Sequence, residues 1–160
     1  VEKLPTFLYN NGSFIDTNTE DIIMANVKEL LKAEENGSLS FGDYSLTQKT
    51  KLDEFSFEGD VYKVKTFQEI TRLEKNGGVV YESVPGSAVH GYKETERQIA
   101  FETEAADDLQ ITLEVEPEKE YKVFVNDTNI GKLKSSLGGK ISFSIELDAG
   151  ETAKVQVVKL

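Results

Sequence analysis

The strongest constraint on the fold is the stretch from Tyr62 to Tyr92, where two extended apolar runs flank the dipeptide Asn76-Gly77. A type I′ turn needs positive φ at both central residues, and Asn-Gly adopts such angles readily. Alternating residues on both sides of this dipeptide predict an antiparallel hairpin, which a second turn at Pro85-Gly86 closes. The same arrangement recurs around Asn11-Gly12 and Asn36-Gly37, so we predict a chain built from hairpins.

Short strands follow one another from residue 38 onward. β-Branched and aromatic residues alternate with polar ones, and Gly, Asn or Asp separates the runs. Turns are predicted at Gly59-Asp60 and Asn126-Asp127, among others. We predict strands over residues 38–44, 55–57, 61–67, 70–74, 79–84, 98–103, 109–116, 121–126, 129–135, 140–147 and 152–158. The later strands recur about every ten residues, which is typical of a β-sandwich or jelly roll.

The alternation also assigns the faces of the later strands. Apolar residues expected to face the core are Ile111, Leu113, Val115, Tyr121, Val123, Val125, Ile141, Phe143 and Ile145. Phe124 then falls on the outer face. An aromatic side chain at that position is a candidate contact surface.

Residues 1–18 have the pattern of an apolar hairpin. A two-stranded hairpin is marginally stable alone, so it must dock either on its own body or on a neighbouring subunit. The side chains left uncovered by the hairpin itself, and therefore candidates for assembly contacts, are Phe7, Tyr9, Phe14 and Ile15.

Residues 19–35 fit two interpretations. Thr19 can cap a helix over about residues 19–31, with a short strand after it, and this is the interpretation we favour. Residues 27–33, however, alternate and lead into Asn36-Gly37 as a strand would.

The composition becomes polar around residues 91–97, which predicts a connector there. The chain is therefore expected to be mainly β, with three parts. These are an N-terminal arm over 1–23, a hairpin-rich antiparallel β module over 24–96, and a β-sandwich of Greek-key or jelly-roll type over 97–160. The two β parts form either separate domains or one continuous body.

The net charge of −11 argues against nucleic acid and anionic membranes as partners, because both require Lys and Arg to neutralise phosphates. No apolar run approaches the roughly 20 residues that a membrane-spanning helix needs. Residues 1–23 contain no apolar segment of the signal-peptide kind, so a cytoplasmic location is favoured over assembly at the cell surface. There is no Cys, which excludes disulfides and thiolate chemistry.

Candidate catalytic and metal-binding residues are few. His90 is the only histidine and stands in a turn context, which fits an ordinary strand-end residue. Glu114 and Glu116 alternate along a strand and so share one solvated face. Asp107 and Asp108 offer hard oxygen atoms, but calcium-loop spacing is absent. We predict no catalytic residue, no metal site and no cofactor.

Four long motifs stand in residues 24–160: KELLKAEENGSLSFGDY, YKVKTFQEITRLEKNGGVVYESVPGSAV, DDLQITLEVEPEKEYKVFVND and GGKISFSIEL. In these motifs the chain resembles a group of small proteins from anaerobic Gram-positive bacteria that carry the label "endosialidase". The resemblance implies a link to glycans and leaves residues 1–23 as an N-terminal extension.

The chemistry of the label can be tested on the residues. Sialidase-type sites usually hold the substrate carboxylate with a cluster of three arginines. This chain has only two arginines, Arg72 and Arg97. The usual sialidase nucleophile is a Tyr with a supporting acid, and none of the six tyrosines stands in such a pattern. The chain also has no Trp to line a glycan groove. We therefore expect no catalytic activity.

Two functions remain as expectations. The first is a non-catalytic structural protein that assembles with copies of itself, into an oligomer or polymer, through strand edges and the N-terminal arm. The second is a glycan-binding accessory module, with sialoglycans among its ligands, in which tyrosines or Phe124 stack on sugars.

Overall fold

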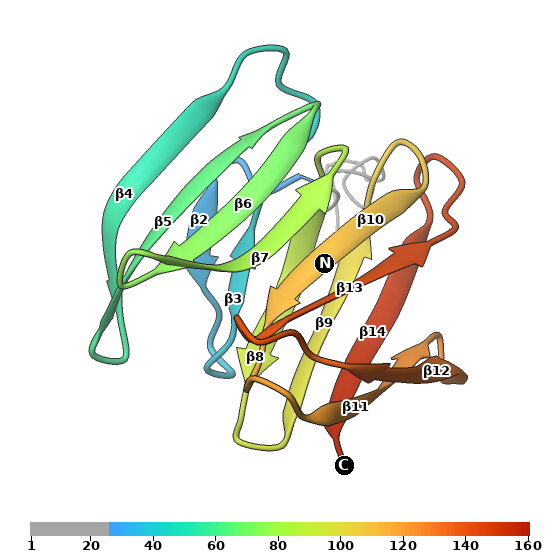
Figure 1. Ribbon diagram of the computed structural model, residues 1–160. Helices are drawn as coiled ribbons and strands as arrows, with labels where there is room; N and C mark the ends of the chain where they lie inside the picture. Colours follow the sequence, from blue (N-terminus) through green and yellow to red (C-terminus); the bar gives the residue numbers. More distant parts are fainter. Residues whose placement is uncertain (1–25) are drawn as a thin grey trace.

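The computed structural model describes residues 26–160 as two antiparallel β-sheets packed as a sandwich (Figure 1). The predicted mainly β fold is confirmed. Residues 26–160 contain no helix, and therefore no helix that could cross a membrane.

Within the described residues, one sheet has six strands and the other has seven. The six-stranded sheet has the order β13 (Lys140–Ile145), β10 (Leu109–Glu114), β7 (Gly78–Val84), β6 (Ile70–Lys75), β5 (Asp60–Phe67) and β4 (Thr50–Phe57). The seven-stranded sheet has the order β12 (Thr128–Lys134), β11 (Glu120–Val125), β14 (Thr152–Lys159), β9 (Gln98–Glu104), β8 (Ala88–Glu94), β3 (Leu39–Phe41) and β2 (Leu31–Ala33).

Both sheets combine strands from the two halves of the chain. β7 pairs with β10 in one sheet, and β8 pairs with β9 in the other. A single cluster of buried hydrophobic residues runs from Leu31 to Val157. The predicted boundary between residues 96 and 97 falls in the β8–β9 turn and does not separate two sheets.

The predicted hairpin turns at Asn76-Gly77 and Asn126-Asp127 are confirmed. Both central residues have positive φ in each turn, 51° and 88° in the first and 52° and 67° in the second. Lys75 pairs directly with Gly78 across the first turn, as a two-residue loop requires. The turn predicted at Gly59-Asp60 lies one residue earlier, at Glu58-Gly59.

The helix predicted for residues 19–31 is wrong over the part that the structure describes, and its remainder lies outside the described residues. Residues 26–30 form turns, and β2 begins at Leu31. Leu30 has a φ of 71°, which a right-handed helix does not allow. The backbone instead bonds to Gly42, since Val27 N donates to Gly42 O at 2.9 Å and Gly42 N donates to Leu30 O at 3.0 Å.

The polar connector predicted around residues 91–97 is wrong up to residue 94, where a strand is found instead. The turn predicted at His90 is also wrong, because His90 lies within that strand. Residues Ala88–Glu94 form β8. A β-bulge shifts the register between His90 and Lys93, and Gly91 within it has a φ of 68°. The bulge interrupts the alternation of side chains, which is why the sequence pattern did not indicate a strand.

The core follows the predicted alternation closely. Of the residues expected to face inward, Val115 and Val125 are half-buried and the others are buried. An aromatic cluster lies between the sheets, with edge-to-face contacts of Tyr81 to Phe41 at 5.3 Å and to Phe101 at 5.5 Å between ring centroids. Tyr92 packs on the same rings.

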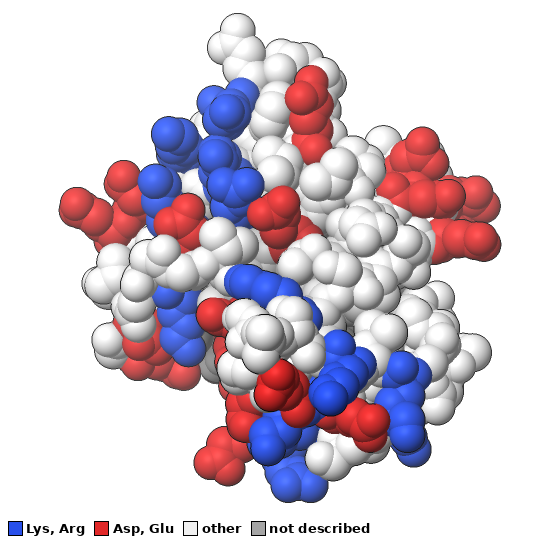
Figure 2. All heavy atoms as spheres, viewed as in Figure 1, with Lys and Arg blue, Asp and Glu red and all other residues white. Residues whose placement is uncertain are grey.

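The outer face of the six-stranded sheet carries a group of cations. Figure 2 shows Lys and Arg gathered over β4–β6 on the six-stranded sheet. Cross-strand register places Lys51 opposite Lys65, and Lys65 opposite Arg72, on that face.

Candidate functional site

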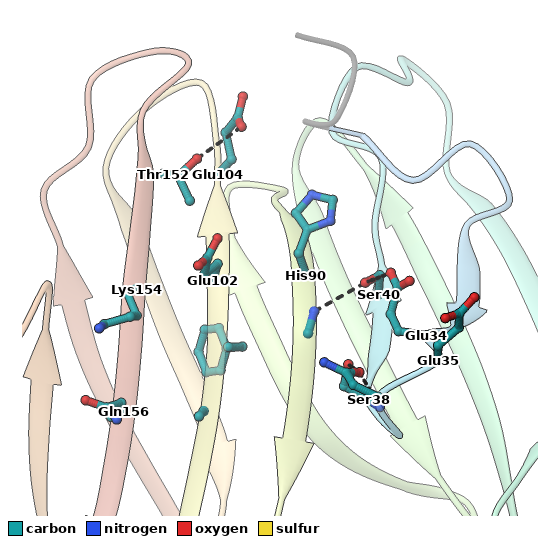
Figure 3. Close-up of a pocket in the computed structure, with 14 residues that line it drawn as sticks. Glu34, Glu35, Ser38, Ser40, His90, Glu102, Glu104, Thr152, Lys154 and Gln156 are labelled. Atoms are coloured by element: carbon teal, nitrogen blue, oxygen red, sulfur yellow. Dashed lines mark hydrogen bonds between the residues drawn. The ribbon is translucent and has the colours of Figure 1, made fainter. Parts of the chain in front are cut away.

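A solvent-open hollow of about 810 Å³ lies on the outer face of the seven-stranded sheet (Figure 3). Its floor consists of outward-facing residues from three neighbouring strands, among them His90 on β8, Glu102 on β9 and Lys154 on β14. Glu34 and Glu35, in the loop between β2 and β3, form one wall. Strands that are far apart in the sequence thus build one concave surface.

The charge of the hollow is mainly negative. Four glutamates line it, Glu34, Glu35, Glu102 and Glu104, against one lysine. That lysine, Lys154, also lies 3.0 Å from the carboxylate of Asp127 through its Nζ atom. The hollow therefore favours cationic or hydroxyl-rich groups and repels carboxylates.

The wall is fixed to the floor by hydrogen bonds. The Ser40 hydroxyl donates to Glu34 Oε2 and accepts from the backbone N–H of Gly91 at 3.2 Å. The bulge in β8 presents that N–H, because it breaks the regular pairing of β8 with its neighbours. The Glu34 carboxylate is consequently positioned before any partner binds.

Glu104 lies at the rim, where it accepts hydrogen bonds from two hydroxyls. Tyr44 Oη donates to Glu104 Oε2 at 3.1 Å, and Thr152 Oγ1 lies 3.5 Å from Glu104 Oε1. Partial burial, followed by the charge of Glu104, raises the pKa of Tyr44. Tyr44 therefore remains a neutral donor at physiological pH and holds this carboxylate in place.

Within residues 26–160, no three His, Asp or Glu side chains come together in a way that could hold a metal ion. Asp107 and Asp108 instead support backbone turns. Asp107 Oδ1 accepts from the N–H of Asp108, and Asp108 Oδ1 accepts from the N–H of Leu147, both at 2.8 Å. Glu116, on the predicted solvated face, pairs with Lys159 at 2.7 Å, and this partner lowers its pKa.

Of the candidate contact residues predicted from the sequence, one lies among the described residues, and it does not line the hollow. Phe124 is half-buried on β11, opposite Gln156 of β14. The others, Phe7, Tyr9, Phe14 and Ile15, lie outside the described residues. His90, by contrast, for which the sequence pattern indicated no special role, lines the hollow.

The strand edges form a second candidate surface, because an edge strand presents unpaired backbone groups. Among the described strands, the edges are β4 and β13 in one sheet and β12 and β2 in the other. Three of these edges are protected. β4 contains a bulge, in which Glu54 has a φ of 58°. β12 pairs irregularly with β11 and carries Lys132 and Lys134, and β2 is only three residues long. Bulges, lysines and shortness all oppose strand addition.

β13 is the least protected of these edges. Its six residues pair with β10 in unbroken register. Its one lysine, Lys140, stands at the first position and donates through Nζ to Val79 O at 2.7 Å. Beyond it, Ser142 and Ser144 face outward and alternate with apolar residues that face the core. The segment is rich in β-forming residues and has no Pro, Gly or acidic residue, a composition that favours addition of another strand.

In comparisons with known proteins, no family model, no curated protein and no solved structure matches this chain.

Proposed function

We propose that this protein is a non-catalytic structural protein that assembles with copies of itself by strand addition. The observation that carries the proposal is the regular, weakly protected edge of β13. A strand that pairs with such an edge forms main-chain hydrogen bonds along its whole length, and alternate side chains set the register. The N-terminal arm, residues 1–23, is the proposed donor, because its apolar hairpin pattern needs a surface to dock on.

The first experiment places charge on the edge. The double substitution Ser142→Lys and Ser144→Lys adds two lysines to β13, which opposes strand addition without touching the core. Thr128→Lys with Ile130→Lys adds the same charge to exposed positions of β12 and serves as the matched control. We expect light scattering to give an oligomer for the native protein and for the control, and a lower native mass for the β13 variant.

The second experiment removes the donor. A variant that begins at Met24 is expected to have a lower native mass than the full-length chain and to retain its folded body. Equal mass and equal stability of the two proteins would contradict the role proposed for the arm. If the β13 variant also keeps the native mass, self-assembly through this edge is excluded.

A glycan-binding module is the second candidate function, and the hollow favours it. Carboxylates, hydroxyls and the Gln156 amide line the hollow and can accept or donate hydrogen bonds to sugar hydroxyls. Phe101, the only aromatic carbocycle in the lining, is buried, so stacking on a sugar ring is not provided there. The four glutamates make neutral or amino sugars better ligands than sialic acid. A glycan array without a signal above background would exclude this function.

A further inference from the structure

The outer face of β4–β6 carries a cluster of five cationic residues, which we call the basic patch: Lys49, Lys51, Lys63, Lys65 and Arg72. Lys51, Lys65 and Arg72 lie on one cross-strand row, directly opposite one another. The row continues to Glu82 on β7, whose carboxylate lies 3.1 Å from Arg72 Nε. The patch is visible as the blue group over these strands in Figure 2.

This arrangement opposes local stability. Like charges directly opposite each other on neighbouring strands are destabilising. Loss of hydration, followed by the charges of Arg72 and the neighbouring lysines, lowers the pKa of Lys65, which reports the same repulsion. A protein of net charge −11 gathers five cations on one face, where their acidic cross-strand neighbours, Glu74 opposite Lys63 and Glu82 opposite Arg72, are fewer than the cations. A local conflict of this kind marks a surface that is neutralised by a partner.

The hollow on the opposite outer face of the sandwich carries the complementary charge, whereas β11 and β12 of the same sheet carry Lys122 opposite Lys132. The hollow described above is lined by Glu34, Glu35, Glu102 and Glu104 and is open to solvent. Lys and Arg have long side chains with flexible stems, so residues of the basic patch can reach carboxylates inside such a hollow.

We propose that the basic patch of one copy contacts the acidic hollow of the next copy. The two surfaces lie on opposite sheets, so the contact is heterologous: each molecule uses one face for the copy before it and the other face for the copy after it. Contacts of this type continue into a row or close into a ring. The inference deepens the self-assembly proposed above and adds to it a second contact, distinct from the β13 edge.

The test is a charge reversal with rescue. Lys49→Glu with Lys65→Glu turns the basic patch nearly neutral, and the carboxylate introduced at position 65 then faces Lys51 and Arg72 as an opposite charge. Glu35→Lys with Glu102→Lys reverses the hollow. Each variant alone is expected to associate at least tenfold more weakly than the native protein. An equimolar mixture of the two is expected to regain association in pairs, because the native basic patch of the hollow variant meets the native hollow of the patch variant.

Two controls test whether a loss of association comes from this contact, rather than from the change in net charge or from unfolding. Lys119→Glu with Lys134→Glu makes the same change of net charge at exposed positions near β11 and β12, and association should remain native. The Lys49→Glu/Lys65→Glu protein should keep its Tm or raise it, which shows that lost association is not lost folding.

Salt distinguishes the two contacts. The charged contact weakens as NaCl rises, because salt screens exposed charges, whereas strand addition at β13 persists. Native association by the Lys49→Glu/Lys65→Glu protein would overturn the inference and leave the β13 proposal intact. Loss of association without recovery in the mixture would also overturn it, since the partner of the basic patch would then be something other than the hollow.

Discussion

Two tyrosines, Tyr81 and Tyr92, lie side by side in the core with ring centroids 6.5 Å apart, yet their hydroxyl groups have opposite surroundings. The Tyr81 hydroxyl bonds to Ser87 Oγ at 2.9 Å. The Tyr92 hydroxyl is equally buried and has no hydrogen-bond partner among residues 26–160. The pair shows how one core can contain both a satisfied and an unsatisfied polar group.

The satisfied region is a network of buried hydroxyls. Ser87 Oγ lies 2.7 Å from Ser83 Oγ, and the backbone of Ser87 both donates to and accepts from Thr71 Oγ1. Thr71 Oγ1 in turn lies 2.8 Å from Thr66 Oγ1. Each member satisfies another, so the network ties β5, β6 and β7 to the segment that leads into β8.

The unsatisfied region lies around a second, smaller hollow of about 150 Å³ that Tyr92 lines together with Tyr62, Asp60 and Glu94. Desolvation, followed by the charge of Glu94, raises the pKa of Tyr92 well above its usual range. The comparison teaches that burial stabilises a tyrosine through its ring, whereas its hydroxyl contributes only where a partner is present.

The largest loss of stability is expected from Gly42→Ala, because the added methyl group would collide with the backbone of Ser87 in the hydroxyl network. Gly42 has a φ of 97°, and an added Cβ would lie 2.3 Å from the carbonyl oxygen of Ser87. Left-handed strain and the backbone clash together should lower the free energy of unfolding by roughly 3–5 kcal/mol, measured by urea denaturation.

Gly59→Ala is the control for that clash. Gly59 has a similar φ of 86°, but nothing lies within 4 Å of an added Cβ. Only the strain of roughly 1–2 kcal/mol is expected there. Equal losses for the two variants would show that contact with Ser87 is irrelevant.

The next effect is expected from Ser87→Ala, which removes the hydroxyl shared by Tyr81 and Ser83. A buried donor left without its partner costs about 1–3 kcal/mol, so we expect a loss of roughly 2–3 kcal/mol in the free energy of unfolding. Ser144→Ala, at an exposed position, should change stability by less than about 0.5 kcal/mol. A loss at Ser87 as small as at Ser144 would contradict the network's role.

A pH dependence is expected at the end of the core where Tyr92 and Tyr62 lie. Burial, followed by the charges of Asp60 and Glu94, raises the pKa of Tyr62 to about 12 from its ordinary value of 10.0. As the pH rises, the unfolded chain therefore loses the Tyr62 proton at a lower pH than the folded protein does. The stabilisation is complete below pH 10 and is lost between about pH 10 and 12, at up to roughly 1.4 kcal/mol per pH unit.

Denaturation measured across that pH range checks the dependence. Tyr62→Phe should have a shallower loss of stability above pH 10 than the native protein. An unchanged slope would mean that Tyr62 ionises alike in the folded and unfolded states.

The smallest effect, and the one of opposite sign, is expected from Tyr92→Phe. Removing a hydroxyl that lacks a partner removes its desolvation penalty, so stability should be unchanged or rise by up to about 1 kcal/mol. Tyr81→Phe, the matched variant, should lose about 1–2 kcal/mol because it leaves Ser87 with fewer partners. If both variants lose the same amount, the two hydroxyls are equivalent and the comparison fails.

Local patterns in the sequence were sufficient for most strands and turns. Asn76-Gly77 formed the expected turn because its requirement for positive φ is met by the dipeptide itself. β8 was missed because its bulge at Gly91 removes the period of two on which strand prediction relies. Residues 26–30 were misassigned because their backbone bonds go to Gly42, which no local pattern reveals.

The hollow could not be predicted, for a related reason. Alternation along β9 indicates that Glu102 and Glu104 share a face. Bringing them to Glu34 requires the pairing of β3 with β8, which joins residues about fifty positions apart. The cross-strand neighbours within the basic patch could not be predicted either, because they depend on the register of the strands, which is set only in the assembled sheet.

The place of β14 has a consequence for how the chain folds during synthesis. β14 follows every other described strand in the sequence, yet it lies between β9 and β11 inside its sheet. Until the ribosome has released it, β9 and β11 each lack a neighbour, and the buried residues Ala153, Val155 and Val157 are missing from the core. The nascent chain therefore cannot complete this sandwich before β14 emerges, and the edges of β9 and β11 need protection until then.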